Sequence, residues 1–211
     1  MLLALDTSTP LVSVALHDGD RVVDAATSER PMKHGEQLTP MIVAALDRVG
    51  AVRQDVRAVA AGVGPGPFTG LRVGLVTART LGMALGIPVY GACSLDVLAL
   101  RAVDLGTVHE PFLATIDARR KELFWASYDE EGRRTEGPHV DRPADLPELL
   151  VAGAGGVLYP DAFTRTTGPE SPDAATLAQA VAEERLELLD PEPIYLRRPD
   201  ATVPGPPKKV S

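Results

Sequence analysis

Short apolar runs of strand length alternate with longer apolar segments of helical period along the first half of the chain. Three predicted strands come first, and a helix, a strand, a helix, a strand and a short helix follow them. The sequence Asp18-Gly19-Asp20 is typical of a tight hairpin turn between the second and third strands. The predicted strands cover residues 2–5, 11–17, 21–26, 56–61 and 87–90, and the predicted helices cover residues 37–49, 71–85 and 94–101.

The second half repeats this order with weaker signals. Its strands are predicted at residues 112–116, 122–128 and 133–137, a short helix at 145–150, a glycine turn within 151–158 and a long helix at 174–188. An aspartate closes the first strand of each half, Asp6 in one and Asp117 in the other. A duplicated β-β-β-α-β-α unit predicts an α/β fold of two lobes, each with a mixed sheet and outer helices, that face a cleft. We expect an N-terminal lobe at 1–103, a smaller C-terminal lobe at 104–198 and a disordered, proline-rich basic tail at 199–211.

A glycine-rich segment at residues 62–74, GVGPGPFTGLRVG, links a predicted strand to a predicted helix. Such a turn lets bare backbone approach an anion at the helix N-terminus. Two common phosphate-binding motifs do not fit, however. Leu71 and Arg72 stand where a P-loop needs Lys followed by Ser or Thr. Thr69 stands where a dinucleotide-binding motif begun at Gly64 needs its third glycine. The segment therefore indicates a different architecture.

The helix that follows carries a stripe of small residues spaced four apart, so that they share one face. The stripe consists of Gly70, Gly74, Ala78, Gly82 and Gly86. Each glycine inside a helix costs about 1 kcal/mol relative to alanine, which suggests that something packs very close to this face. The pattern leaves open whether that is the chain's own sheet or a helix of another chain, and slightly favours the sheet.

The composition limits the classes of function. The chain has 211 residues, enough for one large domain or two small ones with a sizeable core. Because 45% of the residues are hydrophobic and only 4% aromatic, we expect a core of Val, Leu and Ala. The formal net charge of −8 argues against broad, autonomous nucleic-acid binding, which depends on clustered Lys and Arg.

The lone cysteine and the N-terminus bear on the cellular compartment. Cys93 excludes an intrachain disulfide and favours a reducing cytosol, and we expect it to be a buried small residue rather than a nucleophile. The apolar N-terminus is interrupted by Asp6 and has no basic segment before it, which predicts neither a signal peptide nor a membrane span. We expect a soluble, cytoplasmic protein that binds no membrane.

Five segments carry motifs of one known family. They are LALDTST at residues 3–9, SVAL at 13–16, GPGPFTGLRVG at 64–74, DARRKE at 117–122 and YLR at 195–197. By these segments the chain resembles the bacterial TsaB family, also called YeaZ. The resemblance covers nearly the whole chain, to about Arg197. The glycine-proline segment is highly specific, and it departs from the family at Pro67, where the family usually carries serine.

The resemblance implies the actin-like ATPase fold, which sugar kinases and heat-shock chaperones share. It implies a non-catalytic dimerisation or scaffold subunit of the complex that adds a threonylcarbamoyl group to the adenosine next to the anticodon of tRNA. In the family this subunit docks on the catalytic paralogue TsaD, the small ATPase TsaE joins the complex, and the isolated subunit often pairs with itself. We therefore expect contact with tRNA only through partners, and no cofactor.

The resemblance also implies two sets of site residues. The first two helices are expected to dock on the partner through Leu38, Met41, Ile42, Leu46, Gly70, Gly74, Ala78 and Gly82. The second set falls after the first strand of each half and in the glycine turn, near the place where the superfamily holds a nucleotide. These possible nucleotide-proximal residues are Asp6, Thr7, Ser8, Gly64, Gly66 and Asp117.

A metal-dependent transferase of the TsaD kind needs two histidines four residues apart on the first helix, so that one face presents both to one metal. His34 has Arg30 four residues before it and Leu38 four residues after it. Alignment on the Leu-x-Pro-Met run instead puts Met32 and Glu36 at the two positions. The sequence therefore predicts no metal site and no catalytic residue in this chain.

The alternative is a nucleotide-dependent small-molecule kinase of the same superfamily, in which an aspartate after the first strand holds magnesium. Asp6 and Asp117 occupy such positions, but TSTP at residues 7–10 stands where these enzymes carry a glycine that admits the phosphates. We therefore do not expect ATP hydrolysis by the chain alone. No Ser-His-Asp or Cys-His set can be assembled from the sequence for a peptidase.

Overall fold

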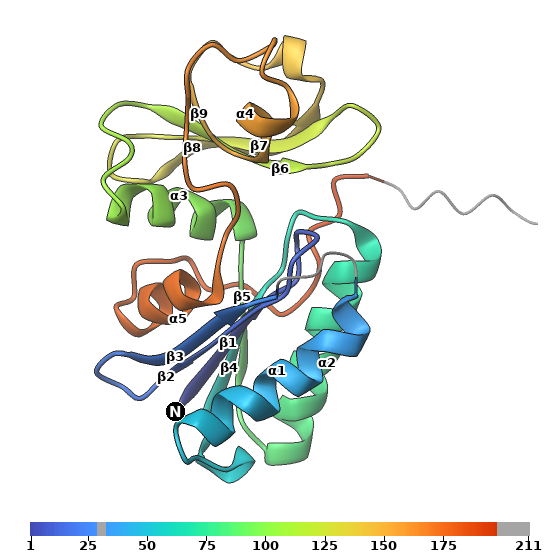
Figure 1. Cartoon of the computed structure of the whole chain (residues 1–211), viewed down its shortest axis with the longest axis vertical. Helices are drawn as coiled ribbons and strands as arrows, with labels where there is room; N and C mark the ends of the chain where they lie inside the picture. Colours follow the sequence, from blue (N-terminus) through green and yellow to red (C-terminus); the bar gives the residue numbers. More distant parts are fainter. Residues whose placement is uncertain (29–32, 198–211) are drawn as a thin grey trace, which may run out of the picture.

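The computed structural model describes residues 1–28 and 33–197, and this part of the chain forms two five-stranded mixed β-sheets (Figure 1). The first sheet has the order β3-β2-β1-β4-β5, with β1 at Leu2–Asp6, β2 at Ser13–His17, β3 at Val22–Thr27, β4 at Ala58–Gly62 and β5 at Val89–Ala92. The second has the order β10-β9-β6-β7-β8, with β6 at Phe112–Asp117, β7 at Leu123–Tyr128, β8 at Arg134–Asp141, β9 at Leu150–Gly153 and β10 at Thr166–Thr167. The predicted tail at 199–211 lies outside the described residues, as do Arg30 and Met32.

The two sheets pair their strands in the same way. In each, the first strand is antiparallel to the second and parallel to the fourth, and the third is antiparallel to the second. The fifth strand lies parallel to the fourth. This repeated topology confirms the predicted α/β fold with duplicated lobes. The further strand and short helix predicted after the first unit form as β5 and α3, and the second half likewise ends with β10 and α5 but has only a 3₁₀ turn before β9.

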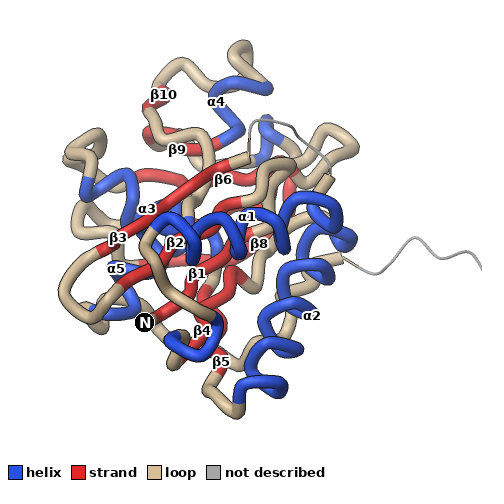
Figure 2. Tube along the Cα trace, turned by 60° about the horizontal axis from the view of Figure 1, so that its bottom comes forward, coloured by secondary structure: helices blue, strands red, loops and turns tan. Residues whose placement is uncertain are grey.

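Two helices cover one face of the first sheet. The helices are α1 (His34–Arg48), α2 (Phe68–Leu85), α3 (Ser94–Asp104), α4 (Ala154–Leu158) and α5 (Ala174–Ala182), with 3₁₀ turns at Arg53–Asp55 and Pro143–Asp145. Figure 2 shows α1 and α2 side by side along the first sheet. Because side chains alternate along a strand, Leu3 and Leu5 pack toward α1 and α2 whereas Ala4 packs toward α5 on the opposite face. Within residues 1–28 and 33–197, no helix is both long and apolar enough to cross a membrane.

The last helix of each half packs on the sheet of the other half. Helix α3 follows β5 of the first sheet but contacts β6, β7 and β9 of the second. Helix α5 comes at the end of the second half but covers β1 to β4 of the first sheet, and the two helices contact each other between the sheets (Figure 1). A cut at the expected boundary, 103/104, would therefore separate each sheet from a helix that packs on it. Helix α5 packs on the first sheet, and α3 packs on the second.

Two elements of the second half differ from the prediction. The helix predicted at 145–150 does not form; a 3₁₀ turn ends at Asp145 and β9 begins at Leu150. Pro147 accounts for this, because proline disfavours the helical conformation of the residue before it and lacks an N–H. The helix predicted at 174–188 ends at Ala182, and Glu184 adopts the left-handed conformation with φ 56°, which cannot continue the helix.

The stripe of small residues on α2 faces the chain's own sheet and first hairpin loop. A Cβ atom added to Gly70 or Gly74 would overlap Thr7, and one added to Gly82 would overlap Val89. Ala78 is fully buried, and Gly86 ends the helix in the left-handed conformation. Of the two explanations left open by the sequence, internal packing is confirmed and insertion of a foreign helix into the stripe is wrong.

The expected docking residues of α1 are also turned inward. Leu38, Ile42 and Leu46 are buried in the core of the first lobe, and Met41 is half-buried against the same core. The assignment of a docking surface to Leu38, Ile42, Leu46 and the small-residue stripe is therefore corrected: the chain itself covers these residues.

The close contact between α2 and the first hairpin predicts that Gly74 tolerates no side chain. We expect Gly74→Ala to lower the free energy of unfolding by about 1–3 kcal/mol, because the new Cβ overlaps Thr7 Oγ1. Gly35→Ala in α1 is the matched control, since its Cβ would meet no atom of residues 1–28 or 33–197 within 4 Å. It should leave stability unchanged or raise it by up to about 1 kcal/mol. Urea unfolding followed by circular dichroism measures both, and equal stabilities of the two variants would contradict the packing.

Candidate functional site

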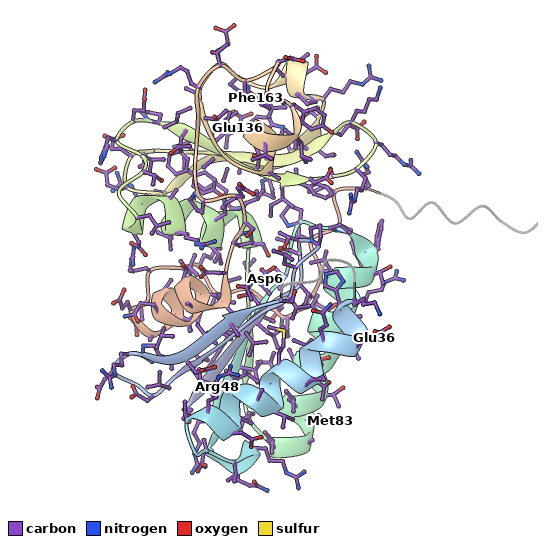
Figure 3. The ribbon with its side chains drawn as sticks, in the orientation of Figure 1. Asp6, Glu36, Arg48, Met83, Glu136 and Phe163 are labelled. Carbon is purple, nitrogen blue, oxygen red and sulfur yellow. The ribbon has the colours of Figure 1, made fainter. Side chains whose placement is uncertain are left out.

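Asp6, at the end of β1, is buried where the first sheet meets the start of α3 (Figure 3). The backbone N–H and the hydroxyl of Ser8 both donate to its Oδ1, at 2.8 and 2.6 Å. The Ser94 hydroxyl donates to its Oδ2 at 2.7 Å. Burial raises the pKa of Asp6 above its ordinary value, and the hydrogen bonds from Ser8 and Ser94 oppose this shift. Both carboxylate oxygens are therefore engaged within the chain.

The glycine turn packs directly on this aspartate and on the loop that follows it. A Cβ on Gly62 would overlap the Asp6 carboxylate, and one on Gly66 would overlap the Ser8 carbonyl. Gly64, at φ 90°, donates its N–H to Ser94 Oγ at 3.2 Å and accepts from the Ser94 N–H at 2.8 Å. The close backbone approach that glycine permits is thus used for contact between two loops of the same chain.

Helices α1 and α2 hold the first hairpin loop from the other side. The Thr7 hydroxyl donates to the Gly70 carbonyl at 2.9 Å, and His34 Nε2 donates to the Thr9 carbonyl at 2.7 Å. Thr7 is fully buried, and His34 is buried at the start of α1. Among residues 1–28 and 33–197, no group of three or more His, Cys, Asp or Glu side chains is placed to hold a metal ion.

The structure brings five of the six possible nucleotide-proximal residues together in this buried contact: Asp6, Thr7, Ser8, Gly64 and Gly66. Asp117 lies apart from them, on the second hairpin, where it lines a cavity against α4. Its Oδ1 accepts from the Arg119 N–H at 2.8 Å, and its Oδ2 pairs with the Arg119 guanidinium at 3.1 Å. Asp6 and Asp117 therefore occupy equivalent positions in the two repeats but different surroundings.

The second hairpin has an unusual backbone. Arg119, Arg120 and Lys121 are consecutive residues in the left-handed region, with φ of 62°, 55° and 62°. This conformation costs about 1–2 kcal/mol for each residue that carries a Cβ. The run of three exposed basic residues therefore stands on a strained turn, closed by the bond from the Glu122 N–H to the Arg119 carbonyl at 3.0 Å.

The C-terminal segment, residues 189–197, runs from the first lobe to the second, a role that the sequence did not predict. It is hereafter called the strap. Gly91, at the edge of the first sheet, exchanges two backbone hydrogen bonds with Leu189, at 2.8 and 2.9 Å, and Ile194 N–H donates to the Val63 carbonyl at 2.9 Å. At the other end, Arg197 donates to the Ala118 carbonyl at 2.9 Å and pairs with Glu122. The motif YLR at 195–197 was its only signal in the sequence.

The strap, the two hairpins and the start of α2 surround a cleft of about 350 Å³ between the lobes. Phe68 and Tyr195 line it with ring centroids 4.6 Å apart, and Arg72 Nε donates to the Tyr195 hydroxyl at 3.2 Å. Arg119 and Arg120 line the opposite wall. A cleft between the lobes was expected from the duplicated fold, but its lining was not predicted, because its walls come from segments far apart in the chain.

The outer face of α2 carries exposed apolar side chains. Val76 is 62% and Met83 82% exposed, and Figure 3 places Met83 on the outside of the first lobe. They border a surface groove of about 570 Å³ whose other walls are Arg72, Leu75, Arg79, Thr80 and Pro193. Val43, on α1, is 52% exposed. We call Val43, Val76 and Met83, with this groove, the outer helical face.

Cys93 is not a functional group of this site. It is 1% exposed, and burial raises the pKa of its thiol to about 12, so that it stays protonated and unreactive at neutral pH. The expectation of a buried small residue is confirmed.

Comparison with known proteins identifies one family. A family model described as "TsaD: tRNA N6-adenosine threonylcarbamoyltransferase" matches residues 28–158. An uncharacterised protein of Mycobacterium tuberculosis strain H37Rv is 44% identical, over 95% of this chain and 93% of its own length. The tRNA threonylcarbamoyladenosine biosynthesis protein TsaB of Escherichia coli K12 is 32% identical, over 93% of this chain and 94% of its own length.

Solved structures agree. YeaZ from Pseudomonas aeruginosa superposes with a TM-score of 0.76 at 31% identity, covering 92% of this chain and 99% of that chain. A second P. aeruginosa structure, of a protein described as similar to peptidase YEAZ, gives 0.79 at 32% identity, covering 93% and 99%. The duplicated lobes and the family match define a two-lobed α/β protein related to the TsaD transferases. More specifically, the chain belongs to the TsaB (YeaZ) family.

The buried position of Asp6 predicts a sign for the pH dependence of stability. A carboxyl group whose pKa is raised in the folded state stabilises the protein below its unfolded-state pKa and loses that contribution as the pH rises through the folded-state value. Asp6→Asn removes this titration. We therefore expect the unfolding free energy of the wild type minus that of the variant to decrease as the pH rises above about 4, the ordinary pKa of an aspartate. Urea unfolding at each pH measures it, and an increase would show that the hydrogen bonds outweigh burial.

Proposed function

We propose that this chain is the non-catalytic subunit of the complex that adds a threonylcarbamoyl group to adenosine in tRNA. Its family membership supports a role in the biosynthesis of threonylcarbamoyladenosine in tRNA. The observation that carries the non-catalytic assignment is the closed packing around Asp6, in which both carboxylate oxygens accept hydrogen bonds from the chain's own side chains and backbone.

The same contacts argue against the alternative, a nucleotide-dependent kinase. Magnesium at Asp6 would have to displace the Ser8 and Ser94 hydroxyls, and phosphates would have to displace the Ser8 carbonyl from Gly66. His34 is likewise occupied by the Thr9 carbonyl. Asp6, the candidate magnesium ligand, and His34, the candidate metal ligand, thus form hydrogen bonds that hold loops together.

We propose the outer helical face as the docking surface, in place of the buried residues first expected. Large apolar side chains exposed next to arginines are the composition found at protein–protein interfaces. Val76 and Met83 lie two turns apart on α2, where they alternate with Arg72 and Arg79, and present a ridge to a facing helix. The occupant we assign to it is a helix of the TsaD-type catalytic paralogue.

The remaining partners follow from this arrangement. A second copy of the chain would compete for the outer helical face, so that the self-dimer and the complex with the paralogue exclude each other. The ATPase TsaE and the tRNA would then reach the complex through the paralogue. The cytoplasm, where the tRNA substrate is found, is the compartment in which we expect this assembly.

A charge on the outer helical face should prevent docking. We expect Val76→Glu to reduce co-purification with the TsaD-type paralogue at least tenfold, because a buried, unpaired carboxylate would enter the interface. Val157→Glu is the control: Val157 is 61% exposed, against 62% for Val76, but belongs to α4 in the other lobe. Both variants should unfold at the wild-type temperature. Equal recovery of the paralogue with both variants would refute the assignment of this face.

A further inference from the structure

Arg72, Val76, Arg79 and Met83 form one stripe on α2. Their spacing of four, three and four residues places them on the same face of the helix. The sequence of α2 contains no acidic residue, and the described residues that line the groove beside this stripe include no Asp or Glu. The apolar ridge of the outer helical face is therefore flanked by positive charge, although the whole chain has a formal net charge of −8.

Both arginines of the stripe contact the strap. Arg79 Nη1 donates to Glu192 Oε1 at 2.6 Å, and Arg72 Nε donates to the Tyr195 hydroxyl at 3.2 Å. Pro193, which lies between Glu192 and Tyr195 in the strap, forms one wall of the groove. The strap therefore runs along the edge of the outer helical face, where Glu192 supplies a carboxylate to α2.

The ion pair between Arg79 and Glu192 is open to water. The two side chains are 56% and 64% exposed, and such pairs contribute little to stability because both partners stay hydrated. Glu192 accepts from one terminal nitrogen of a guanidinium that carries five N–H donors. The pair is therefore weak enough to give way to a second carboxylate.

A helix docked over Val76 and Met83 would remove water from Arg79, which lies between them on the stripe. A cation that loses its water is costly unless a carboxylate and further acceptors replace it. Because Glu192 accepts from a single nitrogen, a docked helix that covers the remaining donors has to supply acceptors of its own.

A second copy of α2 cannot supply this carboxylate. A twofold contact between two α2 helices would bring Arg72 and Arg79 of one copy against those of the other, because both copies present the same surface. Like charges in contact are unfavourable, and α2 has no acidic residue to separate them. The charge of the stripe therefore fits a helix that carries Asp or Glu beside its own apolar residues.

We propose that the helix that docks on the outer helical face presents a carboxylate to Arg79, and that Glu192 of the strap competes with this carboxylate for the same guanidinium. This recognition, which rests on the proposed docking of a TsaD-type paralogue, gives Glu192 an inhibitory role. Two carboxylates at one guanidinium repel each other, so docking weakens the bond between the strap and α2. The strap in turn limits the affinity for the partner.

Binding of the purified full chain to the purified TsaD-type paralogue, measured by biolayer interferometry, tests the proposal. We expect Arg79→Gln to weaken docking about tenfold, because the partner's carboxylate loses its cation. Glu192→Gln should tighten docking about two- to fivefold, because it removes the competing carboxylate. In the double variant Arg79→Gln/Glu192→Gln the second substitution should change nothing, since Glu192 acts through Arg79.

Arg165→Gln is the matched control. Arg165 also pairs with one carboxylate, that of Glu110, and its side chain is 54% exposed against 56% for Arg79, but it precedes β10 in the second sheet. This variant should dock with wild-type affinity, and all variants should unfold at the wild-type temperature.

Tighter docking of Glu192→Gln that disappears when Arg79 is also replaced supports the competition. Weaker or unchanged docking of Glu192→Gln, wild-type docking of Arg79→Gln, or equal losses in Arg79→Gln and Arg165→Gln would overturn it. Weaker self-association of Arg79→Gln with unchanged docking on the paralogue would identify a second copy as the occupant and would also overturn it.

The docking function and the competition fail in different ways. Loss of docking in Val76→Glu together with wild-type docking in Arg79→Gln would overturn the role of Arg79 and leave the docking function standing. A wild-type chain that does not bind the paralogue would refute the docking function, and the competition with it.

Discussion

The contact between the first hairpin loop and the glycine turn is the constraint on which the rest of the first lobe depends. Asp6 accepts three hydrogen bonds inside it, and Gly62 and Gly66 allow the two loops to touch. Helix α2 is set by the same contact, because Gly70 and Gly74 rest on Thr7. Once α2 lies this close, its opposite side is turned to solvent, and the described residues leave Val76 and Met83 uncovered. An interior packing requirement thus produces an exposed apolar ridge.

Much of the fold could be predicted because its central strands, such as β2, β4, β6 and β7, are buried on both faces and are mostly apolar. The strand at 56–61 and the helix at 71–85 appear in the structure as β4 and α2, each within three residues of the expected bounds. The helix expected at 145–150 was predicted from its apolar residues. It does not form, because Pro147 disfavours the helical conformation of the residue before it. Strand β10, at Thr166–Thr167, is too short to produce a periodic signal.

The candidate site was less predictable than the fold. The small-residue stripe indicates close packing but cannot say what packs on it, and the structure assigns it to Thr7 and Val89. Leu38 and Val76 are both apolar helix positions in the sequence, yet one is 1% and the other 62% exposed, a difference that depends on the tertiary arrangement. The strap shows no hydrophobic periodicity. Its hydrogen bonds to Gly91 and Val63 are made by the backbone, so they depend on no particular side chain. Its role could not be inferred from side-chain pattern.

The exchange of α3 and α5 between the lobes has a consequence for any fragment of the chain that contains one half alone. A fragment with only the first half would expose an alanine-lined face of its sheet, formed by Ala4, Ala15 and Ala60, which α5 from the second half covers. The second half alone would lack α3 and leave Phe112 and Ala114 open. We therefore expect neither half to fold as an autonomous module. Truncation to a single lobe would remove the helix that covers the remaining sheet.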